Sequence, residues 1–343
     1  MKRLKTPYAY IINTVVLAAI LVLGNMLFAG GALNRATKSV ILQCGVYSIM
    51  AVSLNLVVGL LGELSLGHAG FVSVGLFTGC LVSLATAEVL PLVVRLPLSM
   101  IVGGLAAALV GLVVGLPALR LKGDYLAIVT LGCGEIIKTV ITNLKITGGA
   151  KGLNTAAIYS DTQTLLPYAI VAVFLVVLVM MNLKNSRHGR AIMAIRDNRI
   201  AAESNGVDVT YYKLMVFILA AFFAGMAGTL YGHTLANIKP AMFDYNASIE
   251  ILVLVVLGGM GSLTGSIVAA IGLTALPELL RSFSDYRMVI YSVVLVVVMI
   301  FKPSGLLGRY EFSLTRAIGR LFGRKGSKTP AQAEPEEGGA EQQ

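Results

Sequence analysis

Nine apolar segments dominate the sequence, and most of them hold the roughly 20 residues that a helix needs to cross a hydrocarbon core. They occupy residues 8–28, 40–61, 64–87, 96–119, 125–144, 165–183, 214–235, 248–280 and 286–301. Only 13% of the 343 residues are charged and 57% are hydrophobic, a composition far from that of a soluble domain. The chain is therefore predicted to be an all-α polytopic membrane protein.

Segment 248–280 is longer than one span and contains the Gly-rich sequence LGGMGSLTG. We interpret it as two elements, which gives about ten transmembrane helices, although eight or nine also fit the pattern. Residues 1–307 then form one transmembrane domain. Residues 308–343 are expected to form a basic interfacial segment followed by a disordered tail rich in Pro, Glu and Gln.

Basic residues are unevenly divided between the two sides of the membrane. With ten spans, the side that holds the N-terminus carries 18 of the 27 Lys and Arg residues, and the other side carries 8. Cytoplasmic loops collect Lys and Arg, so both termini and the loop 184–213 are predicted to be cytoplasmic. The net charge of +10 then reflects membrane orientation, and nucleic-acid binding is not needed to explain it.

The loop 184–213 shows the pattern of a short amphipathic helix. Ala191, Ile192, Ile195 and Ala202 recur at helical spacing, and Gly206 is well placed to end the helix. Such a helix could lie passively among lipid headgroups, or it could dock a soluble partner.

Two Gly-rich interruptions stand out, GELSLGHAGF at residues 62–71 and GGMGSLTG at residues 258–265. Non-helical backbone at membrane depth is tolerated only where protein or a water-filled cavity surrounds it. By analogy with the paired breaks of secondary transporters, both are candidates for a substrate path. The candidate residues are Glu63, Ser65, Gly67, His68, Gly258, Gly259, Gly261 and Ser262. An equally open interpretation makes the first motif a turn between two spans, with Glu63 at the cytoplasmic surface.

Segment 125–144 contains an acid and a base, Glu135 and Lys138, three residues apart on one helical face. Each offsets part of the other's cost of burial, and charges inside a membrane are candidates for function. We therefore add both to the candidate substrate path. A structural pair toward a partner subunit, or closeness to the outer surface, would explain them equally well.

No pattern predicts catalysis or metal binding. The chain lacks the G-x-x-x-x-G-K-[ST] phosphate loop, so it is not expected to bind ATP, and no cofactor is predicted for it. Ser65, His68 and Glu63 lie too close in sequence to predict a catalytic triad, and the histidines lack partners at metal-binding spacing. Transport is favoured over catalysis, with an ion-coupled secondary transporter or channel as the alternative.

Four segments carry a family resemblance: LNLVVGLLGELSLGHAGFVSVG, KGDYLAIVTLGCGEIIKTVITNLKITGGAKGL, SRHGRAIMAIRDNRIAAESNGVDVTYYKLMVFILAAFFAGMAGTLYGH and SIEILVLVVLGGMGSLTGSIVAA. In this order they resemble the LivM-type permease subunits of bacterial branched-chain amino-acid ABC importers. The resemblance covers roughly residues 40–280, and four ordered motifs are far more specific than one. The sequence departs from the family at Glu63, where Gln is more usual.

The resemblance implies that residues 1–307 are the permease domain of a multi-pass subunit in the bacterial plasma (inner) membrane. It implies a heterodimer with a LivH-like permease, two cytoplasmic ABC ATPases that bind the ATP, an extracytoplasmic substrate-binding protein and surrounding membrane lipid. The expected function is movement of branched-chain amino acids, or related small polar solutes, by ATPase-driven alternating access. The family's docking segment matches the inner loop, so the resemblance assigns ATPase coupling to Arg190, Ala191, Ala194, Arg196, Ala201, Ala202, Glu203 and Gly206.

Overall fold

The structure is a computed structural model that describes residues 34–121, 123–283, 286–302 and 305–308. These residues all belong to the larger of the two units into which the chain divides, Val15–Glu311. The first predicted span, residues 8–28, and all but the first residue of the predicted tail 308–343 lie outside the described residues.

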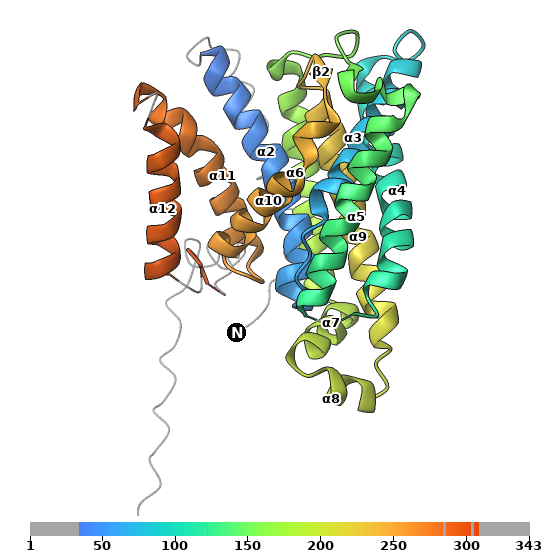
Figure 1. Ribbon diagram of the computed structural model, residues 1–343, viewed down its shortest axis with the longest axis vertical. Helices are drawn as coiled ribbons and strands as arrows, with labels where there is room; N and C mark the ends of the chain where they lie inside the picture. Colours follow the sequence, from blue (N-terminus) through green and yellow to red (C-terminus); the bar gives the residue numbers. More distant parts are fainter. Residues whose placement is uncertain (1–33, 122, 284–285, 303–304, 309–343) are drawn as a thin grey trace, which may run out of the picture. The chain divides into compact units, whose positions relative to one another are not determined.

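Six of the described helices are long and apolar enough to cross a membrane (Figure 1). They are α2 (Arg35–Asn55) with its π-helical continuation η1 (Leu56–Leu61), α3 (His68–Ala85), α4 (Leu92–Ala118), α5 (Asp124–Asn143), α6 (Thr162–Asn185) and α9 (Val209–Gly232). Strands in the described part of the chain are limited to β1 (Leu153–Asn154) and β2 (Asn237–Ile238), which pair antiparallel. The chain is an all-α polytopic membrane protein, as its apolar segments predict.

The long segment 248–280 forms two helices, which confirms its interpretation as two elements. α10 (Tyr245–Gly258) and α11 (Leu263–Leu279) are separated by a corner in which Gly259 and Gly261 have φ angles of 111° and 89°. Only glycine adopts such angles readily. At 1.5 Å per residue, helices of 14 and 17 residues are about 21 and 26 Å long, shorter than a hydrocarbon core of about 30 Å. α12 (Arg287–Phe301) follows the short turn η5 (Leu280–Phe283).

Small residues form the core where α3, α4 and α9 pack together. A Cβ on Gly75 would clash with the backbone of Gly225, and a Cβ on Gly103 would clash with the side chain of Thr229. The Thr229 hydroxyl donates to the Gly75 carbonyl at 2.9 Å. Close backbone approach through small residues is the usual way in which helices pack inside a membrane.

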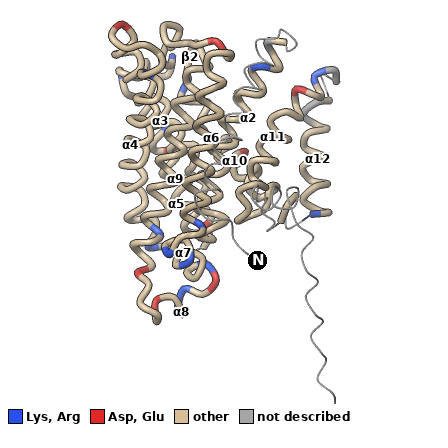
Figure 2. Tube along the Cα trace, turned by 180° about the vertical axis from the view of Figure 1, so that it is seen from behind, with Lys and Arg blue, Asp and Glu red and all other residues tan. Residues whose placement is uncertain are grey.

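The two ends of the described helix bundle differ (Figure 1). At one end lie the strands with the 3-10 turns η2 (Lys145–Thr147), η3 (Gly149–Lys151) and η4 (Pro240–Phe243). At the other end, α7 (Arg187–Asp197) and α8 (Arg199–Ser204) connect α6 to α9. Figure 2 shows charged residues gathered around α7 and α8, whereas the neighbouring spans are almost free of charge.

The loop 184–213 contains two helices where one was predicted. Asn198 interrupts them with extended backbone (φ −155°, ψ 103°), and its side-chain oxygen caps α8 by accepting from the Ala201 N–H at 3.0 Å. Asn favours such a cap over a helix interior. Gly206, at φ 80°, follows the last turn of α8 and ends it as predicted.

Candidate functional site

α7 is held against the spans by a tight corner and by its apolar side. The Ser186 hydroxyl accepts a hydrogen bond from the Gly189 N–H at 3.1 Å, the usual cap of a helix N-terminus. A Cβ on Gly189 would clash with the carbonyl oxygen of Leu183 at the end of α6. Ile192 and Ile195 are buried, so motion of α7 requires motion of the helices beneath it.

The predicted coupling residues differ in exposure. Arg190, Ala194, Ala201, Glu203 and Gly206 are exposed, Ala191 and Arg196 are half-buried, and Ala202 is buried. Ala202 thus packs within its own chain, and of the two alanines on α8 only Ala201 is open to a partner. The sequence pattern did not select Ile200, a large apolar side chain on α8 that is 76% exposed.

Arg196 links α7 to η1 and lies beside both Gly-rich interruptions. Its Nη1 donates to the carbonyl oxygen of Gly59 in η1 at 3.1 Å. Its Cγ lies 2.5 Å from the position that a Cβ would take on Gly62, the first residue of the first interruption. A Cβ on Gly261, in the second interruption, would lie 3.7 Å from Arg196 Nη1. One predicted coupling residue therefore contacts η1 and the first break, and borders the second.

Asn55 ties η1 to the corner between α10 and α11. Its side-chain oxygen accepts from the Gly261 N–H at 2.9 Å, and its amide nitrogen donates to the Ser262 carbonyl and the Ser266 hydroxyl, both at 2.9 Å. Asn55 is buried, and a buried amide is stabilising only when its donors and acceptors are satisfied. Here the donors and the acceptor of the Asn55 amide are all satisfied, by partners more than 200 residues further along the sequence.

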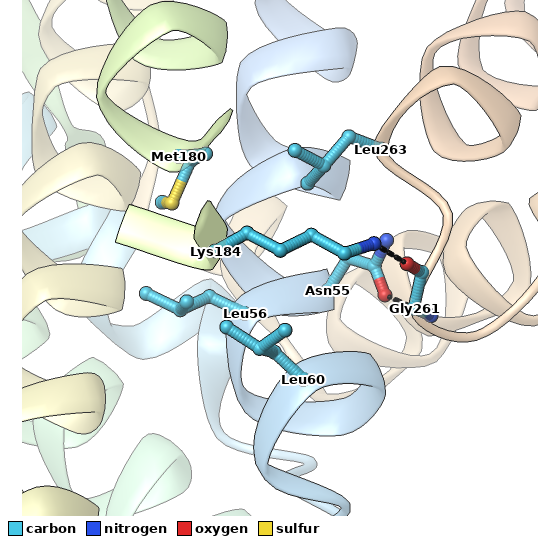
Figure 3. Close-up of a pocket in the computed structure, with 7 residues that line it drawn as sticks. All are labelled: Asn55, Leu56, Leu60, Met180, Lys184, Gly261 and Leu263. Atoms are coloured by element: carbon cyan, nitrogen blue, oxygen red, sulfur yellow. Dashed lines mark hydrogen bonds between the residues drawn. The ribbon is translucent and has the colours of Figure 1, made fainter. Parts of the chain in front are cut away.

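A small pocket lies beside this junction and opens next to the end of α6 (Figure 3). Its lining residues are Asn55, Leu56, Leu60, Met180, Lys184, Gly261 and Leu263. Figure 3 shows the Lys184 side chain extended across the pocket, where Nζ donates to the Gly261 carbonyl at 2.8 Å. The corner between α10 and α11 is thus bonded to α2 and to α6, next to α7.

The first interruption is held by an ion pair with α9. Residues 62–67 are non-helical, and the Glu63 carboxylate pairs with the Lys213 ammonium. The two side chains are only 15% and 3% exposed, respectively. Removal of one partner from a buried pair leaves an uncompensated charge, so this pair fixes the start of the break to the first turns of α9.

Beyond Glu63, the break is packed against three helices. The Leu66 N–H donates to the Thr130 hydroxyl of α5 at 3.1 Å, and the Ala69 N–H donates to the Ser248 hydroxyl of α10 at 3.0 Å. The His68 ring lies 2.8 Å from the Ser53 hydroxyl of α2. Gly67 lies so close to the Thr130 carbonyl that no side chain would fit. Most of residues 65–69 are therefore buried against protein, as irregular backbone in a membrane requires, whereas Gly62 at the start of the break is exposed.

The Ser65 hydroxyl is buried in the same break without a hydrogen-bond partner in the described part of the chain. The other polar side chains of the break are bonded to neighbouring helices. Ser65 is therefore the candidate of this break whose buried hydroxyl is not bonded to the described part of the protein.

Glu135 and Lys138 pair with each other at 2.6 Å on α5. The second carboxylate oxygen of Glu135 accepts from the Tyr245 N–H at the start of α10, at 3.0 Å. This pair therefore bridges α5 and α10, a different place from the junction around Arg196. The Glu135 and Lys138 side chains are 34% and 25% exposed.

His233, one of the histidines without partners at metal-binding spacing, is buried. Its Nδ1 lies 2.9 Å from the Thr229 carbonyl and must carry the proton there, while Nε2 lies 2.8 Å from the Ser83 hydroxyl and accepts from it. Burial lowers the pKa of His233, and the nearby Arg95 guanidinium lowers it further, against the opposing effect of the Thr229 carbonyl. The neutral ring is thus part of the fold just beyond α9.

The junction was only partly predictable. Arg196, Gly261 and Ser262 were candidates, but Asn55 and Lys184 were not, since Asn55 is a polar residue inside the predicted segment 40–61 and Lys184 directly follows the segment 165–183. A polar Asn inside a predicted span was the available signal for the first. Nothing local signals that its partners lie more than 200 residues further along.

Comparison with known proteins gives a consistent result. The family model described as "Branched-chain amino acid transport system / permease component" matches residues 36–302. The LivM permease protein of the high-affinity branched-chain amino acid transport system of Salmonella typhimurium is 36% identical over 327 residues, which cover 85% of this chain and 75% of that protein. The LivM protein of Escherichia coli is also 36% identical, over 80% of this chain and 70% of that protein.

A second permease of the same transport system is a more distant relative. The LivH permease protein of Salmonella typhimurium is 28% identical over 131 residues, 38% of this chain and 42% of that protein. No solved structure gives a significant match to the chain.

Proposed function

Because the chain belongs to the family of branched-chain amino acid transport permease components, we propose that it is the permease subunit of an ABC importer for branched-chain amino acids or related small polar solutes. The observation that carries the proposal is the family match over residues 36–302. The hydrogen bond from Arg196 on α7 to η1, together with the bond from Asn55 to Ser262 in the second break, supplies a physical route for coupling.

The proposed coupling element is the α7–α8 segment. Its tip presents exposed small and apolar side chains, Ala194, Ile200 and Ala201, flanked by Arg190 and Glu203. Small side chains let a helix settle into a shallow groove, and the flanking charges add specificity at the rim. One of the two proposed ATPases would bind there, and the ATPases would bind the ATP, because the sequence contains no G-x-x-x-x-G-K-[ST] phosphate loop.

The proposed transmission runs through Arg196. When the ATPases close, α7 moves, and its hydrogen bond to Gly59 carries that motion into η1. Asn55 and Lys184 carry it on to the corner at Gly261. Packed helices respond to such displacements by switching between discrete arrangements, which is what alternating access requires.

The proposed path for the solute follows the breaks and the α5–α10 contact. The candidates are Glu63, Ser65, Gly67, His68, Glu135, Lys138, Gly258, Gly259, Gly261 and Ser262. Among them, Ser65 offers an unoccupied hydroxyl, and Glu135 with Lys138 offers a charge of each sign. An amino-acid zwitterion also carries one charge of each sign, so such groups suit its passage.

We further propose the assembly and its orientation. The chain would pair with a LivH-like permease and receive its substrate from an extracytoplasmic binding protein. It would lie in a bacterial plasma membrane with the α7–α8 end and both termini in the cytoplasm, in agreement with the division of basic residues.

Reconstitution tests this function against its alternative. Proteoliposomes that contain this chain, the second permease, the ATPases and the binding protein should accumulate labelled leucine only when ATP is enclosed with the ATPases. Leucine accumulation without ATPases, driven by an ion gradient, would instead establish an ion-coupled transporter. Robust ATP hydrolysis by the purified chain alone would contradict the proposal that partner ATPases hydrolyse the ATP.

A further inference from the structure

Glu250 on α10 is an acid without a counter-charge among the described residues. Glu63, Glu135 and Glu278 each pair with a Lys or an Arg. Glu250 lies in the second turn of α10 and is exposed, and within the described part of the chain it has neither an ion pair nor a hydrogen bond. The predicted first span, residues 8–28, contains no Lys, Arg or His that could neutralise it. A charge in a membrane helix is costly and marks a candidate for function whose partner has to be identified.

Three tyrosines on three other helices lie within electrostatic reach of the Glu250 carboxylate. They are Tyr47 on α2, Tyr231 on α9 and Tyr291 on α12. The rings of Tyr47 and Tyr231 meet edge to face, with centroids 6.4 Å apart. All three side chains are half-buried, so each is held by protein and keeps part of its surface open. Aromatic rings attract cations, and phenol oxygens accept hydrogen bonds, so these side chains and the carboxylate together have the chemistry of a site for an organic cation.

The helices that carry Tyr47 and Glu250 also meet at the junction beside α7. α2 and α10 pack against each other (Figure 1). Tyr47 lies eight residues before Asn55 on α2, a distance of about 12 Å. Asn55 is bonded to Gly261, just beyond the end of α10. A ligand held between Tyr47 and Glu250 therefore bridges the same two helices that Asn55 ties together, and a shift at the junction would change its affinity.

We propose that Tyr47, Tyr231, Glu250 and Tyr291, the tyrosine–glutamate cluster, bind the ammonium group of the transported solute. The inference rests on the proposed function and adds to it a binding site and a requirement for positive charge in the solute. An ammonium group donates three hydrogen bonds and carries the charge that Glu250 has no partner for. A neutral amide leaves the carboxylate without a counter-charge, so the cluster favours amino acids over uncharged solutes of similar size.

Leucine uptake by the reconstituted complex tests the role of Glu250. Glu250→Gln keeps the size of the side chain and removes its charge. It should lower uptake at least about tenfold, the effect of losing a charged hydrogen bond. Glu250→Asp keeps the charge and should retain most of the uptake. The matched control Glu278→Gln, on α11, alters an acid that already pairs with Arg281 and should leave uptake unchanged.

The amounts of this chain, the second permease and the ATPases are measured in the same preparations. Normal uptake with Glu250→Gln, or an equal loss with Glu278→Gln, would overturn the assignment. So would an equal loss with Glu250→Asp, or a loss of the chain or of the second permease with Glu250→Gln, because each of these results indicates a structural role. Failure of the wild-type complex to import leucine with ATP is a different result, since it refutes the proposed function itself.

Carbodiimide labelling gives a readout that does not depend on uptake. Dicyclohexylcarbodiimide modifies carboxyl groups that lie in apolar surroundings without a counter-charge, and mass spectrometry of the peptide that contains Glu250 measures the rate. In the purified complex, isoamylammonium, which is leucine without its carboxylate, should slow the modification of Glu250. The neutral isocaproamide should not. Equal protection by the two compounds, or protection by neither, would contradict an ammonium site at this cluster.

Discussion

Replacement of Gly59 by Ala tests the close contact between η1 and the corner that joins α10 to α11. A Cβ on Gly59 would clash with the Asn55 side-chain oxygen and would lie 2.7 Å from the Gly261 Cα. The Gly261 Cα is a backbone atom, so this obstacle cannot be removed by rotation of a side chain. The substitution should therefore separate η1 from the corner between α10 and α11 and break the bond from the Gly261 N–H to Asn55.

The expected cost follows from three contributions. Overpacking costs about 1–3 kcal/mol, and the lost hydrogen bond costs about 1 kcal/mol. Better helix propensity of Ala over Gly returns about 1 kcal/mol. Gly59→Ala should thus lower the free energy of unfolding by about 1–3 kcal/mol. Gly272→Ala, whose Cβ meets no atom of the described residues, should raise it by up to about 1 kcal/mol.

Unfolding of the purified chain by titration with a denaturing detergent measures both values. Leucine uptake by the reconstituted complex then shows whether the distorted junction also fails in transport. If Gly59→Ala is as stable as Gly272→Ala and transports normally, the close approach of η1 and Gly261 is wrong.

Three further predictions concern other contacts. Glu63→Ala leaves the Lys213 ammonium buried without its carboxylate and should destabilise the chain by about 3–5 kcal/mol; the double variant with Lys213→Met should recover most of this loss in the same titration, and no recovery would show that the pair is not coupled. Ile200→Asp should leave chain abundance unchanged because this side chain is exposed, yet abolish co-purification of the ATPases; intact co-purification would remove α8 from the docking surface. Because the pKa of His233 is lowered in the folded chain, the unfolded chain binds more protons, so the free energy of unfolding is highest above a pH of about 6.5 and falls as the pH drops below it. His233→Asn should make the melting temperature depend less on pH between pH 7.5 and 5.5. An unchanged pH dependence would show that His233 is not the group responsible.

The spans were predictable because their signal is local. A run of about 20 apolar residues forms a membrane-spanning helix in a bilayer, and the described helices follow the predicted segments closely. The corner at Gly259 and Gly261 was predictable for the same reason, since a Gly cluster inside an apolar run has few other structural roles. The start of α3 at His68, rather than at residue 64, was not, because the apolar pattern continues through the break.

Long-range contacts account for most of what the sequence did not show. Asn55 bonds a loop more than 200 residues away, and hydrophobic periodicity carries no information about such a partner. The inner loop was predicted as one helix because Ile192, Ile195 and Ala202 keep a helical spacing across Asn198. The cap that Asn198 forms outweighs that periodicity, and it turns Ala202 inward instead of toward a partner.

The central claim, that α7 transmits the work of the ATPases through Arg196, is tested most directly by the amount of leucine imported per ATP hydrolysed. Arg196→Gln removes the charged donor to the Gly59 carbonyl, and the matched control Arg187→Gln alters an exposed arginine of the same helix that is not among the proposed coupling residues. A lost charged hydrogen bond of about 1.5 kcal/mol corresponds to roughly a tenfold effect. Proteoliposomes with Arg196→Gln should therefore hydrolyse ATP but import roughly tenfold less leucine per ATP, whereas Arg187→Gln should match the wild type. An unchanged ratio for Arg196→Gln in an intact complex would contradict the account.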